Sequence, residues 1–180
     1  MSKWQIGIKV KKRFTPYPDV RHLRRIILDI LGEEGAPSPL EASLLITDDE
    51  DVRRLNQRYR GADRTTDVLA FALSEGIPNN SAGNGHRTDQ FVLPESEARQ
   101  LGEVIISYPQ AQRQARKAKT TIEDEVNRLL VHGFLHLMGY DHETPAERKS
   151  MRQRERRIMK NLDHRFNGMV EAAAKTGTVL

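Results

Sequence analysis

The sequence contains no cysteine among its 180 residues. Without thiols the chain can form neither disulfides nor thiolate metal sites, so any metal must be bound by histidine or carboxylate side chains. The absence of cysteine fits the reducing cytoplasm, where we expect the protein to act. Aromatic residues are also few, with one Trp, four Tyr and five Phe. A platform of rings that stacks successive nucleic-acid bases is therefore not evident.

A long hydrophobic run is also missing. The first thirty residues carry charge throughout, and no apolar stretch among them is followed by a small-residue cleavage site. We therefore expect no signal peptide, no membrane-spanning helix and no membrane partner.

A chain of 180 residues is long enough for one domain with a sizeable core and too short for two to be expected. We predict a single domain over residues 1–165. Closely spaced Asn, Ser and Gly residues predict a flexible insertion at 74–99. The apolar pattern fades after about residue 165, which predicts a disordered C-terminal tail over 166–180.

The spacing of apolar residues predicts an α+β fold, in which helices pack on a sheet of four strands. Strand 68–73 is apolar almost throughout, as is typical of a central strand covered on both faces. Gly32 is expected to end the first helix, and Tyr59 is expected to point inward from the second. The strands are expected at 4–10, 42–46, 68–73 and 103–107, and the helices at 20–32 and 48–60 and from residues 109, 121 and 144 onward.

Three of the six histidines lie in the string HGFLHLMGYDH, at His132, His136 and His142. His132 and His136 are four positions apart, which places both rings on one face of a helix, about 6 Å apart along its axis. Gly139 can take the left-handed conformation that ends a helix, so the chain turns back and His142 supplies a third nitrogen. Three protein ligands with a position left for water are typical of catalytic zinc. We therefore predict one zinc ion per chain and metal-assisted hydrolysis.

The helix that carries the first two histidines is predicted to be the core helix. Thr121 and Asp124 form a capping pattern at its start. A buried helix holds metal ligands more rigidly than a loop can, as catalytic geometry requires. Its broad apolar stripe consists of Ile122, Val126, Leu129, Leu130, Phe134 and Leu137.

The string HGFLHLMGYDH resembles the signature of the YbeY family, the bacterial zinc endoribonucleases that mature ribosomal RNA. Two further blocks are similar to family segments: LNQRYRGAD at 55–63 followed by TDVLAF at 66–71, and LGEVIIS at 101–107. The resemblance extends from about residue 40 to about residue 160. Three positions depart from the family pattern and affect only the packing of the strand, namely Thr65, Ala70 and Ala72.

The resemblance implies a mixed sheet with a zincin-like metal-binding helix against it. It also implies a single-strand-specific, zinc-dependent endoribonuclease that takes part in 3′ end maturation of small-subunit ribosomal RNA and in ribosome quality control. Its partners would be single-stranded ribosomal RNA and ribosomes or ribosomal subunits, and DNA is not expected. Arg60 would stabilise charge that develops on the phosphorane. From the residues alone, Arg60 is equally a structural cation at a helix end.

Two alternatives share the histidines. The spacing H-x-x-x-H-x-x-G-x-x-H is that of the metzincin peptidases, but Gly133 stands where their glutamate general base follows the first histidine, which counts against a zinc metalloprotease-like hydrolase. The other alternative is a non-enzymatic ribosome-assembly factor with a structural metal, which requires a fourth protein ligand such as Asp141. A carboxylate in that position more often holds the far nitrogen of a metal-bound histidine.

The net charge of +4 suits a polyanionic partner but also an ordinary solvated surface. Each basic cluster alone is more often a solvated face than an RNA contact. With few aromatic residues, electrostatic tracking of phosphates is the expected mode of RNA binding. The clusters lie at 9–13, 113–119 and 148–157.

Overall fold

The computed structural model describes residues 4–14, 18–73, 98–140 and 144–176, with side chains described as far as residue 162. The chain divides into two compact units, Met1–Tyr140 and Asp141–Leu180, and each is described by itself. Most of the predicted insertion, residues 74–97, lies outside the described residues, and so does His142.

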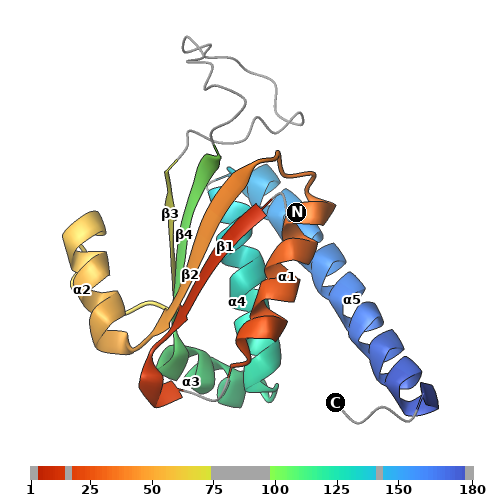
Figure 1. Ribbon diagram of the computed structural model, residues 1–180. Helices are drawn as coiled ribbons and strands as arrows, with labels where there is room; N and C mark the ends of the chain where they lie inside the picture. Colours follow the sequence, from red (N-terminus) through yellow and green to blue (C-terminus); the bar gives the residue numbers. More distant parts are fainter. Residues whose placement is uncertain (1–3, 15–17, 74–97, 141–143, 177–180) are drawn as a thin grey trace. The chain divides into compact units, whose positions relative to one another are not determined.

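The first unit is built on a mixed sheet of four strands in the order β1-β2-β4-β3, as expected (Figure 1). β1 and β4 both run parallel to β2, and β3 is antiparallel to β4. The α+β prediction is thereby confirmed. The strands are β1 Trp4–Val10, β2 Leu40–Thr47, β3 Val68–Ala72 and β4 Arg99–Ser107.

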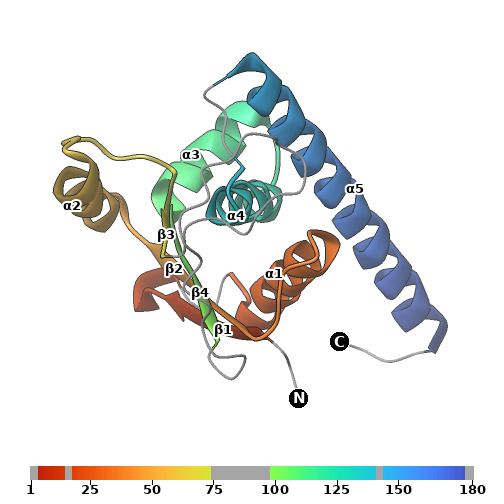
Figure 2. The ribbon, with the colours of Figure 1, turned by 90° about the horizontal axis from the view of Figure 1, so that it is seen from above.

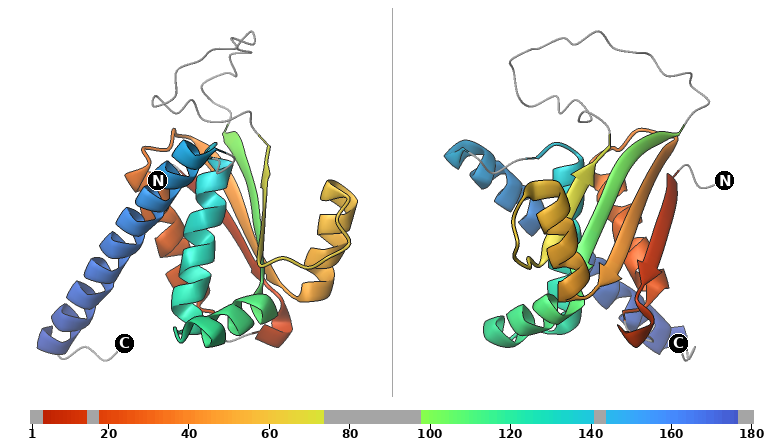
Figure 3. Two further views of the ribbon diagram at one scale, coloured as in Figure 1. Left: turned by 180° about the vertical axis from the view of Figure 1, so that it is seen from behind. Right: turned by 90° about the vertical axis from the view of Figure 1, so that its left-hand side faces the viewer.

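The prediction that residues 68–73 form a central strand was wrong, because β3 lies at the edge of the sheet. An apolar sequence reports whether both faces of a strand are covered, and β3 has α2 on one face and α4 on the other (Figures 2 and 3). It does not report whether both edges are hydrogen-bonded. The two inner positions belong to β2 and β4. β4 begins at Arg99, earlier than predicted, because its first residues are polar.

Four helices surround the sheet in this unit. α1 and α4 pack on one face, and α2 packs on the other (Figure 2). Asp48 caps α2 and accepts a hydrogen bond from the backbone nitrogen of Asp51. The helices are α1 Val20–Glu33, α2 Asp49–Arg60, α3 Tyr108–Ala118 and α4 Ile122–Leu137, with a short 3₁₀ turn at Lys12–Phe14.

Two predicted details of these helices were wrong. α1 does not end at Gly32 but continues to Glu33, and the left-handed residue after it is Gly35, with φ of 62°. A glycine inside a helix costs only about 1 kcal/mol and does not by itself stop the helix. Tyr59 is 59% exposed. It lies at the rim of α2, where its ring contacts Phe71 edge-on at 5.2 Å instead of entering the core.

The described residues of the second unit form one helix, α5 Pro145–Thr176. It starts with a capping box, in which the Thr144 nitrogen donates to Glu147 and the Glu147 nitrogen donates to the Thr144 hydroxyl. The helix continues through residues 166–176, where the sequence pattern predicts a disordered tail. The alanines at 172–174 favour a helix even without an apolar stripe. Within the described ranges, no helix is long and apolar enough to cross a membrane.

Candidate metal centre

α4 begins and ends with signals that lie within its own sequence. At its start, the Thr121 hydroxyl accepts a hydrogen bond from the Asp124 nitrogen at 3.0 Å and donates to the Asp124 carboxylate at 2.7 Å. Three acidic residues in the first turn favour the positive end of the helix dipole. The predicted cap is therefore confirmed, and the helix starts where the sequence places it.

Gly139 ends α4 as predicted. Its φ is 84°, in the left-handed region. The Gly139 nitrogen donates to the His136 carbonyl at 3.0 Å, and the Tyr140 nitrogen donates to the Leu135 carbonyl at 3.1 Å. These two bonds are the Schellman pattern, which turns the chain back at a helix end. The turn directs the chain away from the helix axis just before His142.

The side chains of His132 and His136 lie together on one face of α4. Both are half-buried, and their Nε2 atoms are 3.2 Å apart. Their ring centroids are 4.7 Å apart, with the ring planes inclined by 79°. Two nitrogens bound at about 2.0–2.1 Å to one tetrahedral zinc ion stand about 3.3 Å apart. The separation of this pair therefore fits two ligands of a single zinc ion.

The third predicted ligand, His142, is outside the described residues, and so is Asp141. Among the residues that the structure does describe, no group of three histidine or carboxylate side chains could hold a metal ion. The two described histidines therefore need a further ligand from elsewhere in the chain. His142 is the first histidine in the sequence after the end of α4.

Gly133 explains why no glutamate follows the first histidine. A Cβ atom at this position would lie 2.7 Å from Cγ1 of Val104 on β4 and 3.3 Å from Cγ2 of Val68 on β3. The position therefore faces the sheet so closely that any Cβ would force α4 or Val104 to shift. A glutamate general base of the metzincin kind is absent at this position and would be strained there, which counts against the peptidase alternative.

Arg60 is the last residue of α2, and Gly61 follows in the left-handed conformation with φ of 68°. The Arg60 side chain is exposed, and its Nη2 lies 3.4 Å from the carbonyl oxygen of Ala70 on β3. Since Val68 of the same strand lies close to Gly133 of α4, β3 links Arg60 to the helix that carries the histidines. The described hydrogen bond of Arg60 is thus to the strand and not to a histidine.

The loop between α2 and β3 is held by two polar residues that the sequence analysis did not single out. Asn56 is buried, and its side chain donates to the Arg64 carbonyl at 2.8 Å. Asp67 accepts from the Val68 nitrogen at 2.9 Å and from Gln114 of α3 at 3.1 Å. Asn56 could have been recognised from the sequence, because it is an asparagine on the apolar stripe of its helix. The fixed loop determines where β3 begins beside α4.

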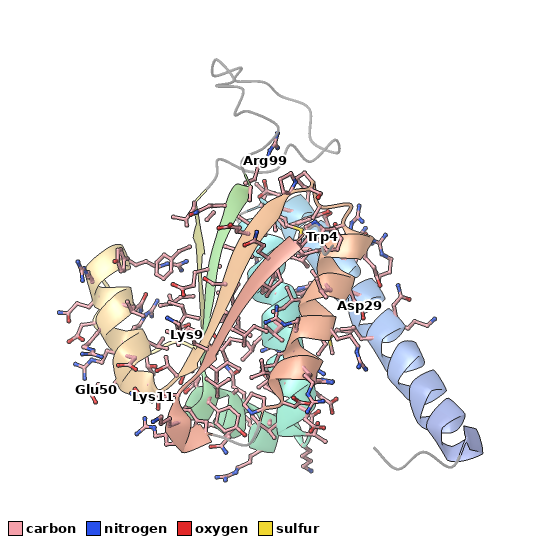
Figure 4. The ribbon with its side chains drawn as sticks, viewed as in Figure 1. Trp4, Lys9, Lys11, Asp29, Glu50 and Arg99 are labelled. Atoms are coloured by element: carbon pink, nitrogen blue, oxygen red, sulfur yellow. The ribbon has the colours of Figure 1, made fainter. Side chains whose placement is uncertain are left out.

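A charged cluster at the ends of β1 and β2 has a structural role. Lys11 follows β1 and lies beside the start of α2 (Figure 4). It pairs with Asp48 and, at 2.9 Å, with Asp51. Hydrogen bonds from Thr47 and Lys11 lower the pKa of Asp51 to about 2. Each carboxylate here already has a cation or hydroxyl partner, so the cluster ties β1 and β2 to α2.

Comparison with known proteins places most of the chain in one family. Residues 7–163 match the family described as Endoribonuclease YbeY. Proteins named Endoribonuclease YbeY are similar over most of their length. One from Dehalococcoides mccartyi (strain CBDB1) is 39% identical over 158 residues, which are 88% of this chain and 93% of that protein. One from Roseiflexus sp. (strain RS-1) is 38% identical over 162 residues, 89% of this chain and 94% of that protein.

A solved structure shares the fold. The solution structure of TM1509 from Thermotoga maritima aligns with a TM-score of 0.57, and the alignment covers 91% of this chain and 93% of that one. Sequence identity to it is 22%, so this likeness supports the α+β fold alone.

Proposed function

The chain belongs to the YbeY family of endoribonucleases, and on this premise we propose that it is a zinc-dependent, single-strand-specific endoribonuclease. Its proposed substrate is ribosomal RNA, with a role in 3′ end maturation of the small-subunit RNA and in ribosome quality control. We also propose that it works in the cytoplasm in association with ribosomes or their subunits.

The observation that carries the proposal is the pairing of His132 with His136 on α4. Their Nε2 atoms are 3.2 Å apart on one side of the second half of α4, where the other residues from Leu129 to Leu137 are buried. The same helix ends in the left-handed turn at Gly139, which precedes His142 in the sequence. We assign these three histidines as the ligands of one zinc ion per chain.

Bound zinc would act as a Lewis acid toward a phosphodiester oxygen. The protein's own contribution is to hold and orient the groups around the reacting phosphate. α4 holds two imidazoles at ligand separation before any substrate arrives, because both ends of the helix are capped. Arg60 has five N–H donors, of which one contacts the Ala70 carbonyl, so its fork remains available to phosphate oxygens.

The two alternatives predict different behaviour. A metalloprotease would cleave casein, and the packing of Gly133 against Val104 counts against it. A ribosome-assembly factor with a structural metal would hold zinc through four protein ligands, Asp141 being the candidate, and would cleave nothing. The experiment first measures the zinc content of the purified protein. The protein is then incubated in parallel with single-stranded RNA, double-stranded RNA and casein, and the substrate that is cleaved distinguishes the endoribonuclease from the two alternatives.

The site is tested by replacing His132, His136 and His142 with alanine, one at a time. Each variant should lose most of its zinc by metal analysis and most of its cleavage of single-stranded RNA. His22→Gln is the matched control, because His22 is also half-buried but lies on α1. Full zinc content in all three alanine variants would contradict the assignment of these histidines as the zinc ligands. Zinc loss without any cleavage by the unmodified protein would favour the assembly factor.

A further inference from the structure

The positive charge of this protein is concentrated in one segment. Residues 148–161 contain seven basic residues and one acidic residue, Glu155, so their net charge is +6. The whole chain carries +4, so all other residues together carry −2. The seven basic residues are Arg148, Lys149, Arg152, Arg154, Arg156, Arg157 and Lys160. A polyanion would therefore be attracted to this segment more than to the rest of the protein.

The segment lies on α5, where helical geometry separates charge from apolar residues. Met151, Ile158 and Leu162 are buried at 2%, 0% and 2% exposure. With about 100° of rotation per residue, Lys149 and Arg156 stand on the side of the helix opposite Ile158. Residues on that side are exposed and line a shallow surface hollow formed by Pro145, Arg148, Lys149, Arg152, Gln153 and Arg156.

Some basic side chains of the first unit are paired with carboxylates. Lys11, Arg53 and Arg113 each form an ion pair with a carboxylate, at 2.9, 2.6 and 2.7 Å. Within the described part of the chain, Lys149 and Arg152 form no such pair. These two side chains are therefore not neutralised by a carboxylate of the described residues. Bringing phosphates to them would release counter-ions at little cost in broken ion pairs.

We propose that the basic face of α5, defined as Arg148, Lys149, Arg152 and Arg156, binds the phosphate backbone of single-stranded RNA. Arg148, Arg152 and Arg156 recur every four residues, about 6 Å apart along the axis, so they form one row of guanidinium groups. This assignment rests on the proposed ribonuclease function. It adds a contact surface outside the residues that hold zinc.

RNA is favoured over a membrane surface as the polyanionic partner, because this segment of α5 lacks aromatic side chains and has few exposed apolar ones. Residues 145–162 contain no aromatic side chain, so the face can neither stack bases nor anchor in a membrane interface. The large apolar residues Met151, Ile158 and Leu162 of the same segment are buried and Met159 is half-buried, so little apolar surface remains to insert among lipids. Guanidinium groups bind phosphate oxygens through two hydrogen bonds at once, and contacts to phosphate carry no information on base sequence.

The test compares two full-length triple variants that lose the same charge. One carries Arg148→Gln, Arg152→Gln and Arg156→Gln. The control carries Arg21→Gln, Arg116→Gln and Lys117→Gln, which are exposed helical positions on α1 and α3. Binding to a single-stranded RNA of mixed sequence is measured over a range of salt concentrations, and a gel shows that the RNA stays intact. Circular dichroism melts show whether each variant is folded.

The plot of log K against log salt should be less steep for the α5 variant, by about 2 in the slope. Each phosphate neutralised on a single strand contributes about 0.7, and the variant lacks three arginines. The control should keep the slope of the unmodified protein. An unchanged slope in the α5 variant, or an equal loss in both variants, overturns the assignment. If the protein binds RNA with the expected slopes but never cleaves it, the proposed activity fails while this surface stands.

Discussion

The hydroxyl of Tyr140 donates a 2.6 Å hydrogen bond to the carboxylate of Glu34, across 106 positions of sequence. Tyr140 lies directly after the left-handed Gly139 that ends α4, and Glu34 is the C-terminal cap residue of α1. The bond therefore ties the turn after the histidine helix to the end of another helix. Both side chains are half-buried, which protects the bond from competition with water.

We predict that Tyr140→Phe weakens zinc binding about tenfold, the lower end of the range seen when residues that support metal ligands are changed. The reason is that the turn leading to His142 would lose its anchor while all three histidines remain. The free energy of unfolding of the metal-free protein should fall by only about 1 kcal/mol. Competition with a fluorescent zinc chelator measures the affinity. Tyr59→Phe is the control, since Tyr59 is 59% exposed on α2, and equal losses in both variants would contradict the prediction.

Gly133→Ala should destabilise the protein by about 1–3 kcal/mol, the usual cost of overpacking a core. The new Cβ would meet Val104 at 2.7 Å, so α4 would have to move from the sheet or the valine would have to shift. Gly32→Ala is the matched control, because that helical glycine has only Trp4 near its Cβ position, at 3.9 Å. Urea unfolding should show that Gly32→Ala is neutral or stabilising by up to about 1 kcal/mol.

Adding Val104→Ala to Gly133→Ala removes the atoms that the new Cβ would strike. The double variant should lose less stability than the sum of the two single variants, with a coupling of about 0.5–3 kcal/mol. Strict additivity would mean that Gly133 is not required for the approach of α4 to β4. Zinc content should follow stability, because His132 precedes Gly133 on the same turn of the helix.

Arg60→Ala should lower kcat by about a hundredfold or more, while zinc content and RNA affinity change little, if Arg60 contacts charge only as it develops. Arg60→Lys should recover only part of the rate, because lysine lacks the planar fork. The side chain is exposed and its bond to Ala70 is long, at 3.4 Å, so stability should hardly change. Arg58→Ala on the same helix is the control. A loss of melting temperature with an unchanged rate would make Arg60 a structural cap instead.

Asp51→Asn should reduce stability at neutral pH but not at pH 2. The pKa of Asp51 is lowered from 3.8 to about 2 by hydrogen bonds from Thr47 and Lys11. A carboxylate with a depressed folded-state pKa stabilises the fold above pH 3.8, and this contribution disappears as the pH falls from 3.8 to about 2. The full pKa shift corresponds to roughly 2.5 kcal/mol of unfolding free energy. Because the side chain is 23% exposed, we expect Asp51→Asn to lose only about 1 kcal/mol at neutral pH.

Urea unfolding at pH 7, 4 and 2 measures this difference. Glu50→Gln is the control, since Glu50 is exposed one position earlier on α2 and its loss removes the same charge. A constant difference between Asp51→Asn and the unmodified protein at all three pH values would contradict the linkage.

Signals that act within a few residues could be predicted from the sequence. The capping of α4 by Thr121 and the left-handed turn at Gly139 depend on local backbone and side-chain geometry, and both occur as expected. The four-residue spacing of His132 and His136 likewise determines that the two rings share a helix face. The roles of Arg60 and His142 stay predictions.

Only the tertiary structure decided the features that depend on which segments meet. β3 reads as a central strand but lies at the edge, because sequence records the covering of faces and not the pairing of edges. Two contacts could be found only in the folded structure, because each joins residues far apart in the chain. They are the close approach of α4 to Val104 at Gly133 and the hydrogen bond between Tyr140 and Glu34. Local geometry is encoded by neighbouring residues, whereas packing distances arise from the whole set of helices and strands that surround them.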